Sequence, residues 1–328
     1  RNHSSAASDV YKRQFVGWGG LISGLLILSF YSVLAGICLD YIFISGTDSG
    51  GMSTTEKFAS QTASVSKLLF WHTAFILMNI IIIGAGVVSG IERIVRLLMP
   101  MLFVLMIVMV VNSIINGDFA RGLSFLFAPN FSDVTPATFL SAMGQAFFSL
   151  SLGMGSIICY GAYMPKDENV FNTSLTVCGL DTLIAIMAGL AIFPIIFAYG
   201  LEPDAGPSLV FISLLSVFWD MPFGNFIGPV FFILLSVAAL SSSISLLEPS
   251  VAFLSEEKIF SRKSASIILG LIAWFLGIGS LLSFNLWSEV NIIGDLNFLN
   301  SMDFLANQFL MPLGCLLYTS PSPRDIGE

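Results

Sequence analysis

Charged residues are scarce in this chain, and their scarcity indicates the class of protein. Only 10% of the 328 residues are Asp, Glu, Lys or Arg, whereas a soluble domain carries about 25%. Acidic residues outnumber basic ones by 21 to 13, and the sequence has no basic cluster, which argues against a nucleic-acid partner. Hydrophobic residues make up 55% of the chain. The composition therefore predicts an all-α protein that crosses a lipid bilayer several times.

Metal-binding and catalytic patterns are also missing from the sequence. The four cysteines have neither metal-site nor disulfide spacing, and the two histidines, His3 and His72, form no constellation. His72 follows Trp71 and is predicted to lie at the membrane interface. We find no nucleophile with a neighbouring base and no intramembrane protease motif. The sequence therefore predicts a protein that is not an enzyme and needs no cofactor.

Both ends of the chain differ from the rest. Residues 1–14 (RNHSSAASDVYKRQ) and 315–328 (CLLYTSPSPRDIGE) are polar or turn-forming, and each adjoins an apolar span without a cap or loop. Because they are similar to translated adaptor sequence, we predict that both are non-native tails outside the fold. The sequence has no signal peptide, so we expect the chain to begin within a longer protein.

Between these tails lie about eight apolar segments that are long enough to cross a bilayer. They are residues 16–46, 66–89, 94–116, 137–164, 170–200, 225–255, 263–287 and a shorter one at 300–314. The basic residues of the short loops set the expected orientation. If the first span ends outside, six basic residues are cytoplasmic (Arg93, Arg96, Lys166, Lys258, Arg262, Lys263) and three are external (Lys57, Lys67, Arg121).

The segment Gln145–Tyr163 contains poor helix-forming sequence at mid-span, Ser151-Leu-Gly153-Met-Gly155. Each interior glycine costs about 1 kcal/mol relative to alanine, and a backbone group freed in hydrocarbon costs several kcal/mol more. We therefore expect a discontinuous helix at about 138–165, unwound beside a cavity where its backbone binds an ion or a polar solute. The alternative is that glycine and serine simply let neighbouring helices approach closely.

Two acidic residues, Asp181 and Glu248, fall clearly within spans, where an ionisable group is costly and suggests function. The Asp181 carboxylate would suit a monovalent cation. The alternatives are a side chain that is hydrogen-bonded between helices, or one that is protonated because it is buried. Glu248 precedes Pro249, where the helix lacks a donor, so a structural role is as well supported as a functional one. On the same segment Ala238, Ser241 and Ser242 share a helical face. Their oxygens suit sodium, although serines also bond neighbouring helices.

These residues resemble a known family. The stretches Gln145–Tyr163 and Ala238–Glu257 and the link Ser89–Pro100 are similar to those of the neurotransmitter:sodium symporters, specifically bacterial amino-acid transporters of LeuT fold. The resemblance covers residues 15–314. It implies a fragment of an inverted-repeat bundle that corresponds to transmembrane helices 3 to 9 and the beginning of helix 10.

The resemblance also implies roles for residues that match the family's motifs. The two sodium sites are expected at Ser149 and Asp181 and at Ala238, Ser241 and Ser242. The substrate-binding residues are expected to be Ile27, Tyr31, Phe148, Ser149, Ser151, Met154, Ser242 and Leu246. The outer gate is expected to use Tyr31, Phe148 and Asp303, the last with a basic partner on the absent helix 1.

One departure from the family concerns chloride. Chloride-dependent members have an asparagine at the position of Asp181 and a serine one turn later, where this chain has Ala185. A fixed carboxylate supplies the negative charge that chloride otherwise brings, so we expect chloride not to be required.

The resemblance predicts sodium-coupled symport of an amino acid by alternating access, across a bacterial inner membrane and through a multi-pass protein. The oligomeric state is open. Met154 favours a substrate with an apolar or aromatic side chain. Because helix 1 would complete both sodium sites, we expect this polypeptide alone neither to bind nor to transport tightly. The alternatives are a proton-coupled amino-acid transporter, since Asp181 can titrate, and a solute-gated channel or sensor.

Overall fold

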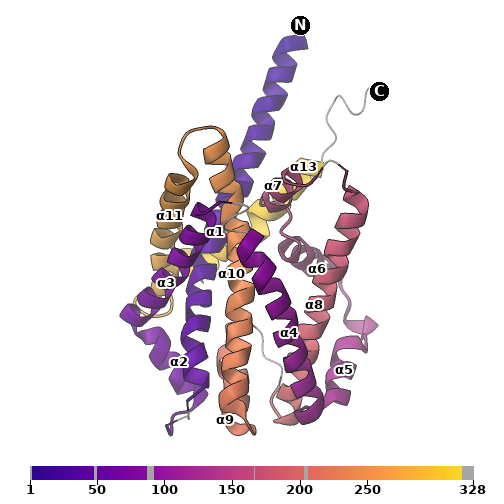
Figure 1. The fold of residues 1–328 in the computed structure, drawn as a ribbon, viewed down its shortest axis with the longest axis vertical. Helices are drawn as coiled ribbons and strands as arrows, with labels where there is room; N and C mark the ends of the chain where they lie inside the picture. Colours follow the sequence, from indigo (N-terminus) through magenta and orange to yellow (C-terminus); the bar gives the residue numbers. More distant parts are fainter. Residues whose placement is uncertain (1, 48–49, 87–91, 166, 203–205, 320–328) are drawn as a thin grey trace.

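The computed structural model describes residues 2–47, 50–86, 92–165, 167–202 and 206–319. Among them, six helices are long and apolar enough to cross a membrane. These are α1 (Asn2–Ser45), α3 (Val65–Gly84), α4 (Arg93–Asn116), α8 (Val170–Ala198), α10 (Gly224–Glu256) and α11 (Arg262–Leu282). Figure 1 shows them running broadly along the long axis of the molecule. The all-α membrane architecture predicted from the composition is confirmed.

Shorter elements connect the long helices. They are α2 (Thr54–Ala63), α5 (Phe119–Phe127), η2 (Phe131–Asp133), α6 (Pro136–Ser149), α7 (Ser156–Ala162), η3 (Leu209–Ser213), α9 (Leu214–Asp220), α12 (Phe298–Asp303), η4 (Phe304–Leu310) and α13 (Met311–Thr319). Strands β1 (Asn291–Ile293) and β2 (Leu296–Asn297) pair antiparallel.

Two of the eight predicted spans are not single helices. The segment 137–164 divides into α6 and α7, which confirms the discontinuous helix, and the segment 300–314 divides into α12, η4 and α13. Each piece is too short to cross a bilayer alone.

The predicted boundaries of the two tails do not coincide with the ends of helices. α1 begins at Asn2 and continues through Gln14, and α13 continues past Cys315 to Thr319. Residues 320–328 lie outside the described part of the chain. The foreign origin of the two tails stays a prediction.

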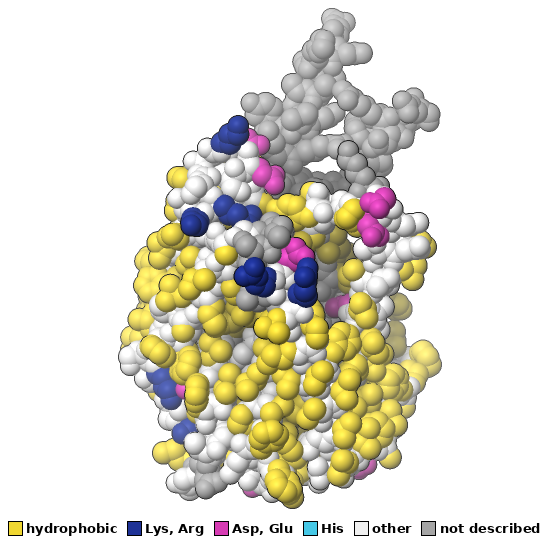
Figure 2. All heavy atoms as spheres, viewed as in Figure 1, with side chains coloured by type: hydrophobic (Ala, Val, Ile, Leu, Met, Phe, Trp, Pro, Cys, Tyr) yellow, Lys and Arg dark blue, Asp and Glu magenta, His cyan; other side chains and the backbone are white. Residues whose placement is uncertain are grey.

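The core lies where α1 meets α10. An added Cβ at Gly24 would lie 2.8 Å from the Leu246 carbonyl oxygen, so the two backbones approach closely there. One buried cluster includes Tyr41 of α1, Phe232 of α10 and Phe211 of η3. A second cluster surrounds the break between α6 and α7. The outer surface is apolar over most of one face, with charged side chains gathered mainly near one end (Figure 2).

His72 lies inside the helix bundle, and its position at the membrane interface stays a prediction. Its side chain is fully buried, and its Nε2 lies 3.2 Å from the Trp274 carbonyl oxygen of α11. An added Cβ at Gly277 would lie 2.4 Å from the imidazole ring. The ring therefore fills the close contact between α3 and α11, which neighbouring residues in the sequence do not reveal.

Candidate functional site

The break between α6 and α7 has a backbone that ordinary residues avoid. α6 ends at Ser149 and α7 begins at Ser156. Between them Ser151 has φ of 54°, and Gly153 and Gly155 each have φ of 82°. A left-handed serine is uncommon and costs about 1–3 kcal/mol, and such strain clusters at functional sites.

Close backbone contacts hold this break in place. An added Cβ at Gly153 would lie 2.6 Å from the Met311 carbonyl oxygen of α13. The Gly153 carbonyl oxygen itself would lie 3.2 Å from a Cβ added at Gly20 and 2.8 Å from one added at Gly314. The unwound segment is therefore fitted between α1 and α13. A side chain at Gly153 or Gly314 would overlap the neighbouring backbone, and one at Gly20 would make a tight contact.

The structure brings together the two residues of the first predicted sodium site. The Ser149 hydroxyl at the end of α6 lies 2.8 Å from Oδ1 and 2.7 Å from Oδ2 of Asp181 on α8. Ser149 is exposed and Asp181 is half-buried. A hydroxyl and a carboxylate facing each other at the end of a broken helix provide the oxygen ligands that a hard cation prefers.

The residues of the second predicted sodium site lie on one turn of α10. The Ser241 hydroxyl donates to the Ala238 carbonyl oxygen at 2.9 Å, so these two oxygens are adjacent. The Ser242 side chain is exposed and lies close to the Tyr31 side chain of α1. A predicted sodium ligand, Ser242, is therefore adjacent to a predicted substrate residue, Tyr31.

The predicted substrate residues also meet. Ile27, Met154 and Leu246 belong to one buried cluster, and Tyr31 and Phe148 pack against it. In this arrangement the side chains contact each other, so a solute would have to replace those contacts. Ser151 instead lines a neighbouring cavity of about 330 Å³ beside the break.

The predicted gate residue Asp303 lies at the end of α12, and Asn307 of η4 donates a hydrogen bond to its Oδ1. Among the described residues Asp303 forms no ion pair. η4 is a π-helical turn, a distortion that is frequent at functional sites.

The structure adds a row of polar contacts between α7 and α10 that sequence reasoning missed. The Ser156 hydroxyl donates to the Ser245 carbonyl oxygen at 2.8 Å, and the Tyr160 hydroxyl lies 3.0 Å from Ser245 Oγ. The Tyr163 hydroxyl donates to Glu248 Oε1 at 3.2 Å. Spacings of four and three residues put these side chains on one face of α7 and the residue that follows it. That periodicity is visible in the sequence, but the partners are not.

Glu248 is the most buried of these groups. It is 0% exposed and forms an ion pair with Arg262 at the start of α11. Arg262 Nε also donates to the Ile83 carbonyl oxygen of α3 at 3.0 Å. The sequence left the role of Glu248 open, and the structure gives it a half-buried partner, Arg262, that joins α10 to α11 and α3.

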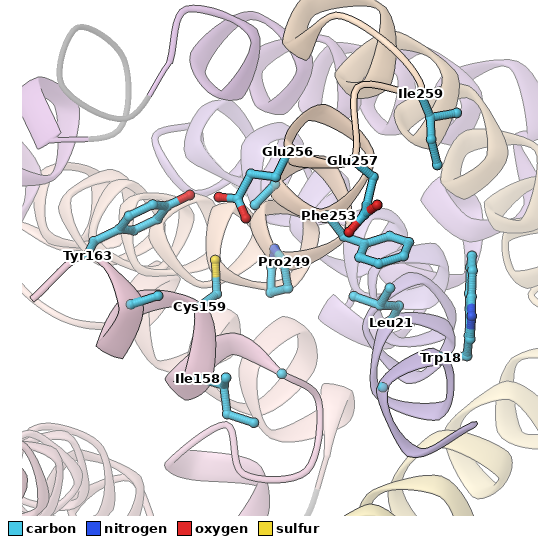
Figure 3. Close-up of a pocket in the computed structure, with 14 residues that line it drawn as sticks. Trp18, Leu21, Ile158, Cys159, Tyr163, Pro249, Phe253, Glu256, Glu257 and Ile259 are labelled. Atoms are coloured by element: carbon cyan, nitrogen blue, oxygen red, sulfur yellow. The ribbon is translucent and has the colours of Figure 1, made fainter. Parts of the chain in front are cut away.

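A cavity of about 550 Å³ opens beside this row, between α1, α7 and α10. Trp18 and Phe253 pack edge to face at its rim, with ring centroids 5.3 Å apart. Figure 3 shows Glu256 turned toward Tyr163 on the opposite side, with Cys159 below them. Glu257 lies beside Phe253, so aromatic rings and carboxylates occur on both sides of the cavity (Figure 3).

Comparisons with known proteins identify a family and a similar solved structure. A sequence model of the "Sodium:neurotransmitter symporter family" matches residues 52–286. An uncharacterized sodium-dependent transporter of Bacillus subtilis, YhdH, is 34% identical over 100% of this chain and 75% of its own length. One from Haemophilus influenzae is 36% identical over 95% of this chain and 71% of its own length. The crystal structure of MhsT in complex with L-phenylalanine superposes with a TM-score of 0.85 at 43% identity, over 92% of this chain and 70% of MhsT.

Proposed function

Since the chain belongs to the sodium:neurotransmitter symporter family, we propose that it functions in sodium-coupled symport of an amino acid by alternating access. The observation that carries the proposal is the Ser149–Asp181 contact at the end of the broken helix. A cation there neutralises the carboxylate within the membrane and gains both residues' oxygens. Family relatives described as sodium-dependent support sodium as that cation.

The two ion positions have different chemistry. Ser149 and Asp181 offer a fixed negative charge, whereas Ala238, Ser241 and Ser242 offer neutral oxygens. Sodium at both positions would order the residues around the break and favour one conformation, as a ligand with different affinities for two states does. Solute and ion would then be released together when the bundle opens on the other side.

We expect the substrate to be an amino acid with an apolar or aromatic side chain. Ile27, Met154, Leu246 and Phe148 provide an apolar surface, and the adaptable thioether of Met154 accommodates several shapes. Tyr31 and Ser151 would bind the polar end of the solute, as would Ser149 and Ser242. The related MhsT was solved with L-phenylalanine, which agrees with this choice.

Opening toward the Arg262 end would require α7 to separate from α10. Ser156 and Tyr160 of α7, and Tyr163 directly after it, bond α10 in the described conformation. We therefore assign this conformation as closed between α7 and α10, and Asp303 as the gate at the opposite end.

Uptake into proteoliposomes tests the proposal. Two preparations are compared. One is the 328-residue chain, and the other is the same chain extended by the segments of the Bacillus subtilis relative that lie outside the matched region. We expect the longer protein to accumulate labelled phenylalanine when sodium is outside, and the shorter chain to be inactive. Uptake that stays the same when choline replaces sodium, in both preparations, would refute sodium coupling.

The same assay separates the alternatives. A proton-coupled transporter would respond to an imposed pH gradient without sodium, because Asp181 would carry a proton instead of an ion. A channel or sensor would show no fixed ratio of solute to sodium flux. Expression in bacterial cells, followed by fractionation, tests the expected location in the cytoplasmic membrane.

A further inference from the structure

Asn79 is a buried polar residue in an apolar part of α3. Its side chain is 0% exposed, and its Nδ2 donates to the Phe75 carbonyl oxygen at 3.0 Å. A carbonyl oxygen only accepts hydrogen bonds, so this contact fixes the orientation of the amide. The Asn79 Oδ1 atom is therefore presented to α10 as an acceptor.

The partner of Asn79 on α10 is Ser243. The Ser243 hydroxyl donates to Asn79 Oδ1 at 2.7 Å, and Ser243 is also 0% exposed. Its single hydrogen has one other acceptor, the Leu240 carbonyl oxygen at 2.9 Å. A helical serine without a cross-helix partner bonds back to its own helix in this way. The hydrogen bond to Asn79 therefore orients the Ser243 hydroxyl toward α3.

The direction of Ser243 determines where its two neighbours point. Successive residues of an α-helix are rotated by about 100°, so three consecutive serines face three directions. Ser243 faces α3, Ser242 lies close to Tyr31 of α1, and Ser241 bonds the Ala238 carbonyl oxygen of its own helix. Rotation of α10 about its axis would change the surroundings of Ser243 and Ser242 together, and it would turn Ser241 and the Ala238 carbonyl, which bond each other within the helix, by the same angle.

We propose that Asn79 is a positioning residue for the second sodium site. Through Ser243 it holds the rotation of α10 at which Ser241, Ser242 and the Ala238 carbonyl present their oxygens to one cation. Asn79 itself does not contact the ion. This inference rests on the proposed sodium symport and adds a residue on α3 to the ion-binding machinery.

The test measures the sodium concentration for half-maximal uptake in whichever proteoliposome preparation transports. Asn79→Ala and Ser243→Ala should each raise it about three- to tenfold, the effect of one net hydrogen bond. The two substitutions combined should raise it no further, because they remove the same contact. Ser243→Thr keeps the hydroxyl and should restore the lower value. The uptake rate at saturating sodium should change less, since the ion site and not the transport step is altered.

A control and a stable variant separate positioning from folding. Ser113 is also buried and bonds another helix, through the Leu190 carbonyl oxygen at 2.7 Å. Ser113→Ala should lower the yield of folded protein without moving the half-maximal sodium concentration. If single variants fold poorly, Asn79→Leu with Ser243→Ala replaces both partners by apolar groups, which is nearly neutral for stability.

Each outcome decides the inference. An unchanged half-maximal sodium concentration in the folded double variant overturns the positioning role and leaves sodium symport standing. An equal shift in Ser113→Ala also overturns it, because the effect would then be general. A parent protein that shows no sodium dependence overturns the proposed function itself.

Discussion

At the level of single residues, the expected independence of chloride rests on the Asp181 carboxylate. We predict that replacing chloride by gluconate leaves sodium-driven uptake unchanged. Asp181→Asn should weaken sodium binding about ten- to one-hundredfold, because hydrogen bonds and contacts to a charged group are worth about 1.5–3 kcal/mol. Asp181→Asn with Ala185→Ser should make uptake depend on chloride. Uptake by the unaltered protein that rises with chloride at constant sodium contradicts this prediction.

Glu248 and Arg262 form a pair whose two members should respond differently to substitution. Arg262→Met leaves a fully buried carboxylate without its partner and should lower the free energy of unfolding by about 3–5 kcal/mol. Glu248→Leu should cost less, because the Arg262 side chain is 22% exposed and reaches water. The double substitution should be milder than Arg262→Met alone. Thermal unfolding in detergent measures all three.

The exposed pair Glu92 and Arg96 provides the matched control. Its side chains are 48% and 77% exposed, so Arg96→Met should change the free energy of unfolding by less than about 1 kcal/mol. Equal effects of Arg96→Met and Arg262→Met would show that burial of the Glu248 pair contributes nothing.

At the level of elements, the break between α6 and α7 depends on Gly153. Gly153→Ala places a Cβ 2.6 Å from the Met311 carbonyl oxygen and imposes a left-handed backbone on alanine. We expect a loss of at least about 1–3 kcal/mol in the free energy of unfolding. Gly161→Ala in α7 is the control, since a Cβ there has no atom within 4 Å, and it should be neutral or stabilising by up to about 1 kcal/mol. Equal melting temperatures for both variants would contradict the strained break.

The sequence predicted this break because its cause is local. Two glycines one residue apart weaken a helix wherever they occur, and the surrounding apolar run places them within a membrane. The contacts of Asn79 with Ser243 and of His72 with Trp274 were not predictable in this way. Each joins residues that are far apart in the chain, and only the packing of whole helices brings them together.

At the level of the whole molecule, hydropathy predicted the positions of the six long helices, whereas two of the eight expected spans are divided into shorter pieces. The candidate ion and substrate residues came from resemblance to a family. Arg262 shows what this reasoning misses. Counting it as a loop charge predicted its side of the membrane, but its burial against Glu248 depends on how α11 starts beside α3 and α10.

The predicted orientation can be tested with two exposed positions, Ser60 on α2 and Glu257 at the end of α10. In a chain whose four cysteines are replaced by alanine, Ser60→Cys should react with a membrane-impermeant maleimide on intact cells. Glu257→Cys should react only after the cells are permeabilised, because basic residues near it favour the cytoplasm. The opposite pattern would reverse the assignment of the two faces.

The shortness of α7 has a consequence for how the molecule loses structure. A helix of seven residues does not persist by itself, because nucleation costs more than so few turns recover. α7 therefore keeps its shape only through its bonds to α10. Its amide hydrogens should exchange with deuterated solvent sooner than those of α10, making this two-turn segment the part of the protein that opens first under mild warming.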